Sequence, residues 1–249
     1  MIKQRILALD IETSLIEAYV FDIKDQYITH SDIKKDWHIL AWCAKWVGEK
    51  GVTYKETRNG DDRGILKALW ELLNQADIVL TQNGTSFDAK KINARFMLHG
   101  FKPPKPYVHY DTYRLTKKVA GFTSHSLEYL TSKFCKKHKK TSHGKFPGKK
   151  LWIECSKGNK EAWKEMRAYN IEDVLSLEEL YLEIKAWAPE SMPKVFPLTD
   201  SSKQCGTCGF EGQMIKGNPR QAAKHMYRQN SCPKCGAWQK AEKITKEIQ

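Results

Sequence analysis

Two Cys-x-x-Cys pairs near the end of the chain constrain its fold more strongly than any other feature. Cys205 and Cys208 form the first pair, Cys232 and Cys235 form the second, and 23 residues separate them. This spacing is typical of a four-cysteine tetrahedral zinc site, and a complete set of cysteines leaves His225 unnecessary as a ligand. A segment of about 49 residues buries too little apolar surface to be stable alone. We therefore expect one structural Zn²⁺ here.

The other cysteines bear on the cellular compartment. The chain has seven cysteines, and Cys43, Cys135 and Cys155 are expected to be free thiols. An odd number with four in metal-type pairs favours a reducing compartment over a secreted disulfide framework. No apolar stretch approaches the roughly 18 to 20 residues of a spanning helix, and residues 1–13 lack the pattern of a secretory leader. We expect a cytoplasmic protein.

Most of the formal net charge of +13 comes from two segments. Lys133–Lys150 contains eight lysines and no acidic residue, and residues 201–249 carry nine basic against three acidic residues. The remaining 182 residues together carry a charge of −1. Two positive segments on a nearly neutral body favour nucleic acid as a partner. The alternative interpretation is a solubilising loop together with a basic tail.

The lysine-rich segment Lys133–Lys150 also contains Gly144, Pro147 and Gly148. This composition predicts a mobile loop. No amphipathic helix coincides with it, so a membrane is not expected as a partner. Within the segment we expect substrate contacts from Lys136, Lys137, Lys139 and Lys140.

The first three-quarters of the chain show the pattern of an α/β domain. The Ile/Leu-rich run at 5–13 predicts a first strand, and residues 17–23 and 37–47 predict its neighbours in the sheet. Beyond them we expect helices over 62–75, 88–99, 124–134 and 160–187, and strands over 77–81 and 107–110. The sequence thus divides into an α/β domain at 1–188, a Pro/Ser-rich linker at 189–203 and the zinc module at 204–249.

Carboxylates lie in several of these elements. Asp10 and Glu12 share one face of the first strand, because strand side chains alternate between the two faces. Asp88 follows a strand at the start of a helix, where aspartate is also a common N-terminal cap. In the long helix, Tyr169 and Asp173 are four residues apart and share a face. Carboxylates in an apolar strand must be paired, solvated or metal-bound, so a divalent-metal site is expected.

Two acidic residues near these candidates are expected to stay outside the chemistry. Tyr107 and Asp111 repeat the Tyr-x-x-x-Asp spacing on a short strand, where Asp111 could only support the site indirectly. Glu172 points about 100° away from Asp173 on the helix and is expected to be solvated.

Three motifs in this order resemble those of the DEDD (DnaQ-like) 3′–5′ exonucleases: Asp10-Ile-Glu-Thr13, Asn83-Gly-Thr-Ser-Phe-Asp88 and Tyr169-Asn-Ile-Glu-Asp173. The middle motif is similar to that of the exonuclease domain of family-B DNA polymerases. The resemblance covers about residues 5–187 and implies a ribonuclease H-like mixed sheet flanked by helices. Tyrosine in place of histidine before the last aspartate implies the DEDDy subgroup. The cysteine module resembles a zinc ribbon.

The resemblance also implies roles for these residues. Asp10 would bridge two Mg²⁺ or Mn²⁺ ions, Glu12 and Asp173 would bind the ion that activates water, and Asp88 would support the second ion. Tyr169 would orient the attacking water. Two such ions can generate the nucleophile and stabilise the leaving oxygen in phosphodiester hydrolysis.

The resemblance further implies that Asn83 and Phe87 contact the terminal nucleotides, with a core position for Phe87 as the alternative. We therefore predict a 3′–5′ exonuclease that acts on single-stranded 3′ ends, with DNA preferred over RNA, in proofreading or processing in trans. The zinc ribbon would contact nucleic acid through basic residues or dock onto a separate DNA polymerase or replisome protein. The alternatives are a structure-specific endonuclease and a catalytically idle nucleic-acid adaptor.

Overall fold

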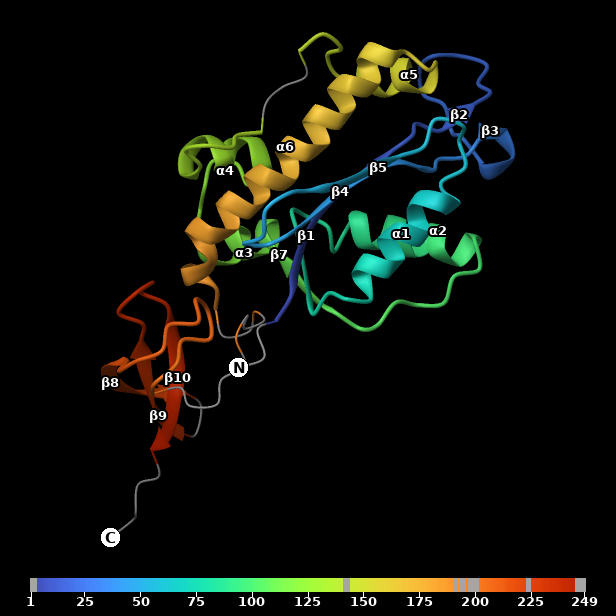
Figure 1. Cartoon of the computed structure of the whole chain (residues 1–249). Helices are drawn as coiled ribbons and strands as arrows, with labels where there is room; N and C mark the ends of the chain where they lie inside the picture. The colour runs from blue at the N-terminus through green and yellow to red at the C-terminus, as the bar shows by residue number, and fades with distance from the viewer. Residues whose placement is uncertain are drawn as a thin grey trace.

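The computed structural model describes residues 4–140, 144–189, 192, 196, 202–222 and 225–244. Its centre is a five-stranded sheet of β1 (Ile6–Thr13), β4 (Ile39–Trp46), β5 (Thr53–Glu56), β6 (Ile78–Thr81) and β7 (Val108–Asp111) (Figure 1). The strand order is β5-β4-β1-β6-β7. β1 pairs antiparallel with β4 and parallel with β6, so the sheet is mixed and β1 lies at its centre.

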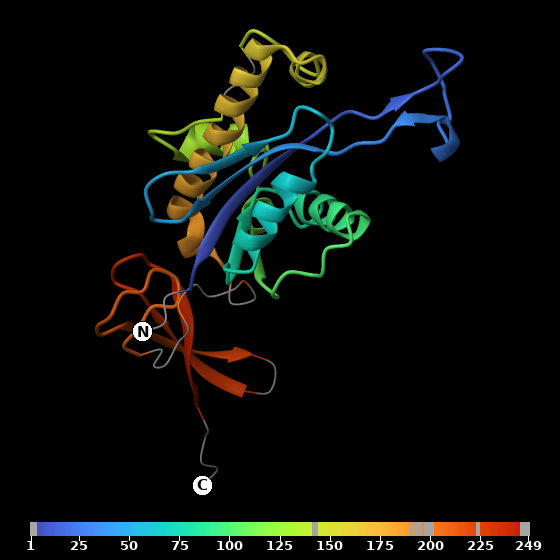
Figure 2. The ribbon, with the colours of Figure 1, turned by 45° about the vertical axis from the view of Figure 1, so that its right-hand side comes forward.

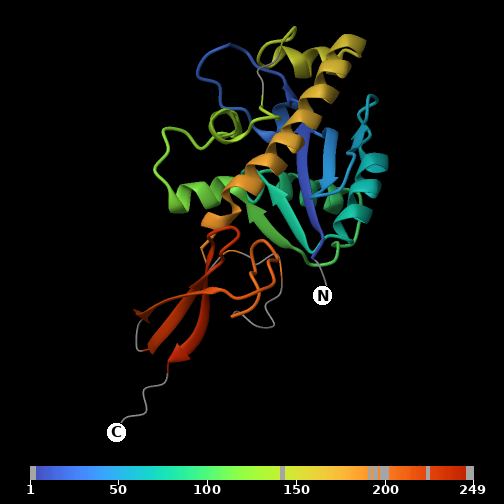
Figure 3. The same ribbon diagram turned by 60° about the vertical axis from the view of Figure 1, so that its left-hand side comes forward.

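Helices cover both faces of this sheet. Leu7, Leu9 and Ile11 of β1 pack on one face against α1 (Arg63–Leu73) and α2 (Asp88–Leu98). Ile6 and Ala8 point to the other face, where they pack with α3 (Thr112–Val119), α4 (Leu127–Phe134) and α6 (Lys160–Ile184). Figure 3 shows α6 crossing the strands. The alternation of strand side chains therefore places Asp10 and Glu12 on the α6 face.

A smaller core forms at the beginning of α6. Helix α5 (Lys150–Ser156) buries Leu151 and Cys155 against Trp163 of α6 and Leu40 of β4. Phe146, in the preceding turn, joins the same cluster. The prediction of a mobile loop over Lys133–Lys150 is therefore wrong for this part, because its apolar residues are buried against α6.

Residues 17–23 do not form a neighbour of β1 in the main sheet, which corrects the sequence prediction. Only β2 (Glu17–Ala18) is a strand, and it pairs with β3 (Ile33–Lys35), next to the short helix η1 (His30–Asp32), in a separate two-stranded sheet. This arm extends away from the body (Figure 2). The antiparallel neighbour of β1 is β4 instead, and all but the last of the residues of β4 are buried.

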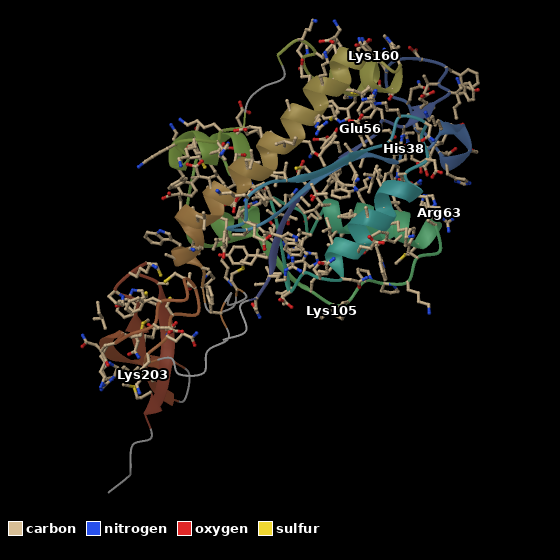
Figure 4. All side chains as sticks on the ribbon, viewed as in Figure 1. His38, Glu56, Arg63, Lys105, Lys160 and Lys203 are labelled. Carbon is tan, nitrogen blue, oxygen red and sulfur yellow. The ribbon has the colours of Figure 1, made fainter. Side chains whose placement is uncertain are left out.

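The arm is closed at its base by the side chains of Ser14 and His38. Ser14 Oγ lies 3.1 Å from His38 Nδ1, and the His38 backbone N–H donates to Ser14 Oγ over 3.0 Å. His38 is labelled in Figure 4, where the chain returns to the sheet. This junction follows directly after the carboxylates of β1.

The cysteine module contains an antiparallel sheet in the order β10-β9-β8, formed by β8 (Ile215–Ala222), β9 (His225–Ser231) and β10 (Trp238–Ile244). It lies beyond the end of α6, which continues into the short helix η2 (Lys185–Trp187) (Figure 1). Ala186 of η2 packs against the cysteine cluster. The linker predicted at 189–203 falls largely outside the described residues.

The mixed sheet with helices on both faces is the α/β architecture that the sequence predicted. Within the part of the chain that the structure describes, no helix is both long and apolar enough to cross a bilayer.

Candidate active site

Three acidic side chains meet between β1 and α6. One carboxylate oxygen from each of Asp10, Glu12 and Asp173 falls within 4.8 Å of the others. Glu12 is 9% exposed and Asp173 is 3% exposed. Buried carboxylates this close together repel one another unless a proton or a cation intervenes. Three of the four carboxylates named from the sequence are thus brought to one place.

Helix α6 supplies two further side chains on the same side. Tyr169 lies one turn before Asp173, and Asn170 donates a hydrogen bond from Nδ2 to Asp10 Oδ2 over 2.6 Å. Asn170 is fully buried, and its Oδ1 has no hydrogen-bond partner among the described residues. Sequence reasoning missed Asn170. Its signal was a polar amide on the buried face of a long helix, next to a motif tyrosine.

Asp88 lies beside this cluster and is not part of it. It is the first residue of α2, and its Oδ1 accepts a hydrogen bond from the Ile11 backbone N–H over 3.2 Å. Asp88 is 5% exposed, and burial raises its pKa to about 7. The Asp88 carboxylate therefore holds the backbone of β1 at Ile11, between Asp10 and Glu12.

The loop that precedes Asp88 is held by Asp111. The Asp111 carboxylate accepts hydrogen bonds from the backbone N–H groups of Asn83 and Thr85 and caps the start of α3. Asn83 has a positive φ of 62°, a conformation that asparagine tolerates better than most residues. This geometry leaves Asn83 exposed and Phe87 42% exposed. The alternative of a core position for Phe87 is therefore wrong.

The lysine-rich segment reaches the site along α6. Backbone N–H groups of Lys136, Lys137 and His138 donate to the Glu179 carboxylate, and that of Lys139 donates to Glu172 over 3.1 Å. The sequence predicted a solvated side chain for Glu172. In the structure, its carboxylate instead accepts this hydrogen bond from the Lys139 backbone. The side chains of Lys136, Lys137 and Lys139 are exposed.

Lys140 behaves differently from the other lysines of the segment. Its Nζ lies 2.5 Å from Asp173 Oδ2 and 4.6 Å from the centroid of the Tyr169 ring. The Lys140 side chain is 24% exposed. Its ammonium group therefore supplies a positive charge to the carboxylate cluster itself. Residues 141–143, which follow, lie outside the described residues.

Trp152 of α5 is a second contact that sequence reasoning missed. Its Nε1–H donates to Glu12 Oε2 over 3.0 Å. The Trp152 and Tyr169 rings meet edge to face, with centroids 6.3 Å apart and an interplanar angle of 79°. No motif signalled this contact, because α5 lies between the predicted loop at Lys133–Lys150 and the predicted helix at 160–187, where no element was expected.

Burial dominates the electrostatics of the site. It raises the pKa of Glu12 to about 8 and, with the charge of Asp173, holds the pKa of Asp10 well above its ordinary value. Burial acts to lower the pKa of Lys140, but Asp173 and the other acidic groups outweigh it, so the pKa is raised. Burial and the Asp173 charge also raise the pKa of Tyr169. A divalent cation would therefore stabilise the ionised forms of these carboxylates.

The chemistry of this donor set fits a hard divalent ion. Carboxylate oxygens are the ligands that Mg²⁺ and Mn²⁺ prefer, and the close approach of Asp10, Glu12 and Asp173 allows them to share one cation. A second acidic group, formed by Asp61, Asp62 and His99, fits less well. There Arg95 already pairs with Asp62 over 2.7 Å.

The cysteine cluster fits zinc. The four sulfur atoms lie within 4.8 Å of one another, and the Cys205–Cys235 and Cys208–Cys232 Sγ distances are both 3.7 Å. Zinc–sulfur bonds of about 2.3 Å in a tetrahedron imply sulfur–sulfur distances of about 3.8 Å. The cluster is therefore compatible with a zinc module.

A family model described as the RNase_H superfamily matches residues 29–185, more than half of the chain. The chain belongs to the RNase_H superfamily. The ribonuclease H-like fold and the family resemblance expected from the sequence are thereby confirmed. The matched span of this superfamily member contains Asp88, Tyr169 and Asp173, whereas Asp10 and Glu12 precede it.

Among solved structures, the chain is similar to the family B DNA polymerase from the hyperthermophilic archaeon Pyrobaculum calidifontis, with a TM-score of 0.57 and 14% sequence identity. The match covers 74% of this chain and 25% of the polymerase chain. The chain thus corresponds to about a quarter of that polymerase. No curated protein matches the sequence. The superfamily fold and the acidic cluster together indicate a metal-dependent nuclease.

Proposed function

We propose that the protein is a metal-dependent 3′–5′ exonuclease that hydrolyses DNA phosphodiester bonds from the 3′ end. The observation that carries this proposal is the meeting of Asp10, Glu12 and Asp173 beside Tyr169. The DEDDy-like motif order and the structural similarity to a family B DNA polymerase support it.

Asp10, Glu12 and Asp173 would bind Mg²⁺ or Mn²⁺. Burial and the nearby negative charges, that of Asp88 among them, raise the pKa of Asp10, so Asp88 would support a second ion. Ions of this kind supply an activated water and stabilise the leaving oxygen of the phosphodiester. The remaining contributions come from the protein itself. Asn170 fixes Asp10 by its 2.6 Å hydrogen bond, so the central carboxylate needs no reorganisation.

Tyr169 would act by positioning. Because its pKa is raised, the phenol keeps its proton at neutral pH and cannot serve as a general base. Its O–H can instead hold a water or a phosphate oxygen by hydrogen bonding. Lys140 lies over the same ring and would attract the substrate phosphate.

The terminal nucleotide would lie against the loop that precedes α2. Phe87 presents an exposed ring, and the Lys91 ammonium lies 5.8 Å from its centroid. Aromatic rings stack on bases with little dependence on sequence. Asn83, exposed on the same loop, could contact the sugar or the base. Lys136, Lys137 and Lys139 would contact the phosphates of the strand.

The zinc module would increase affinity for nucleic acid. Basic side chains lie between its two cysteine pairs, among them Lys216 and Arg228. Phosphate contacts of this kind release counterions and weaken as salt concentration rises. A separate DNA polymerase or replisome protein is the other partner that we propose for the module.

A gel time course tests the proposal. The substrates are 5′-labelled linear single-stranded DNA, the same DNA as a circle, and linear RNA of matching sequence, each with Mg²⁺ and with EDTA. We expect a ladder that shortens one nucleotide at a time on linear DNA, and no cleavage of circles. Because EDTA also competes for zinc, the D173A variant in Mg²⁺ is the matched control.

Three outcomes would contradict the proposal. Cleavage of circular DNA would identify an endonuclease on the same fold. Binding without cleavage in either Mg²⁺ or Mn²⁺ would identify a nucleic-acid adaptor. Faster shortening of RNA would identify a ribonuclease.

A further inference from the structure

The indole ring of Trp152, in α5, lies beside the carboxylate cluster. Trp152 Nε1–H donates to Glu12 Oε2 over 3.0 Å, and its ring packs edge to face on Tyr169. Trp152 therefore contacts one acidic residue from β1 and one motif residue from α6. It links the two elements that form the site.

The indole is held by a core outside the site. Its neighbours Leu151 and Cys155 are almost completely buried, and the Cys155 carbonyl accepts a hydrogen bond from Trp163 Nε1–H over 3.0 Å. These residues pack together with Leu40 of β4. Side chains in a packed core occupy defined rotamers, so the helix that carries Trp152 has a fixed position.

A neutral donor suits this place. The indole N–H is a donor only, and it carries no charge that would compete with a cation. An ionised carboxylate offers about four lone-pair sites, so Glu12 can accept this bond and still ligate an ion. Lys140, by contrast, brings a full positive charge to Asp173. The Lys140 ammonium therefore competes with a cation for Asp173, whereas the neutral Trp152 indole does not compete with a cation for Glu12.

We propose that Trp152 is a positioning residue that fixes the Glu12 carboxylate for cation binding and so couples the packing of α5 to the site. This inference rests on the proposed function, in which Glu12 binds the metal. Hydrogen-bond partners of metal-ligating carboxylates commonly strengthen metal affinity about 10- to 100-fold.

The test compares W152F with W70F in the full-length, zinc-loaded protein. Trp70 lies in α1, and its Nε1–H donates to the Lys102 carbonyl over 2.7 Å, so W70F removes an indole hydrogen bond away from the cluster. Mn²⁺ affinity is measured by electron paramagnetic resonance without nucleic acid. We expect W152F to weaken Mn²⁺ binding about tenfold and W70F to leave it unchanged.

A double-mutant cycle with E12Q separates positioning from general destabilisation. If Trp152 acts through Glu12, W152F should have little further effect on the residual Mn²⁺ affinity of E12Q. An equal loss in both backgrounds would overturn the inference, as would wild-type Mn²⁺ affinity in W152F. Thermal unfolding by circular dichroism shows whether each variant is folded.

A measurement without a tryptophan variant covers the case in which W152F does not fold. Indole ¹⁵N-labelling gives one N–H signal for each of the eight tryptophans. One signal should shift on Mg²⁺ addition in the wild type and stay unchanged in E12Q. The absence of any shift in the wild type would overturn the inference. These measurements need no cleavage, so a failed nuclease assay with an intact cycle would refute only the proposed function.

Discussion

The Lys140 ammonium lies 2.5 Å from Oδ2 of Asp173, inside the group of carboxylates that the fold brings together. The lysine comes from a basic segment, whereas the aspartate is 3% exposed on α6. In the absence of a divalent ion, the lysine places a positive charge directly beside Asp173. The stability of the site without metal should therefore depend on Lys140.

Replacing this lysine should cost more without metal than with it. K140M leaves Asp173 without its ion-pair partner, and losing one member of a buried pair costs about 3 kcal/mol. Mg²⁺ restores the missing positive charge, so the loss in free energy of unfolding should be smaller in its presence. Urea denaturation of K140M with and without Mg²⁺ measures both values. K139M is the matched control, because the Lys139 side chain is exposed; equal losses for K140M in both buffers would contradict the prediction.

Removing a central carboxylate should abolish cleavage and leave the fold intact. D10A and D173A each remove a candidate metal ligand, and both relieve repulsion within a buried acidic group; in D173A, Lys140 loses its ion-pair partner but keeps the attraction of Asp10. Single-stranded DNA affinity should change little, since it comes mainly from lysines elsewhere. Product formation on gels and binding by fluorescence anisotropy measure the two effects separately. Wild-type activity in either variant would show that the assignment of the site is wrong.

The elements that carry the site were predictable because their patterns are local. The first strand is a short Ile/Leu-rich run, and the long helix has apolar residues on one stripe at Val174, Leu177, Tyr181 and Ile184. Tyr169 and Asp173 share a face by helix geometry alone. The faces of the strand and the helix that carry the carboxylates could therefore be predicted without the tertiary structure.

The residues that were missed depend on contacts between distant segments. Trp152 reaches Glu12, which is 140 residues away, only because α5 packs on the beginning of α6. The Gly- and Lys-rich composition of Lys133–Lys150 indicated a loop, and the tertiary burial of Phe146 overrode that local signal. Residues 17–23 have strand-like composition but no space beside β1, where β4 pairs.

Removing the Tyr169 hydroxyl should slow cleavage without weakening metal binding. Y169F keeps the ring that contacts Trp152 but loses the O–H that would position water or phosphate. Misplacing a reacting group by about 1 Å can cost about 100-fold in rate, so a fall in kcat of that order is expected. Single-turnover kinetics at saturating Mn²⁺ measures it. A tyrosine-like ionisation that governs the pH profile of the wild type would argue instead for a role as general base.

The metal-free protein should lose stability as pH rises above 6.5. Glu12 has a folded pKa of about 8 and Asp88 of about 7, both above their ordinary values, so the folded state retains protons that the unfolded state has lost. The free energy of unfolding therefore falls with pH through this window. Burial lowers the pKa values of His38 and His109, which gives the opposite slope, but only below about pH 6.5. Urea denaturation between pH 6.5 and 7.5 isolates the carboxyl effect, because burial also raises the pKa values of Cys43, Cys135 and Cys155 to about 12, which adds a slope of the same sign near pH 8.

E12Q is the control for this pH dependence. It removes the group with the pKa of about 8 and should flatten the upper part of the slope. Saturating Mg²⁺ should do the same in the wild type, because the ion takes the place of the protons. A metal-free wild type whose stability increases from pH 6.5 to 7.5 would contradict the prediction.

Loss of one module cysteine should remove zinc and unfold only the module. C205S eliminates one of four sulfur atoms that lie within 4.8 Å of one another, and binding energy at such a site is largely folding energy. The zinc content should fall from one ion per chain to none, while Mn²⁺ binding at the carboxylates persists. C135S is the control. It replaces a buried thiol outside the module, which donates a hydrogen bond to the Ser176 carbonyl, and the variant should retain its zinc. Mass-spectrometric metal analysis decides between these outcomes, and a C205S protein that keeps a full zinc ion would show that the four cysteines are not the ligand set.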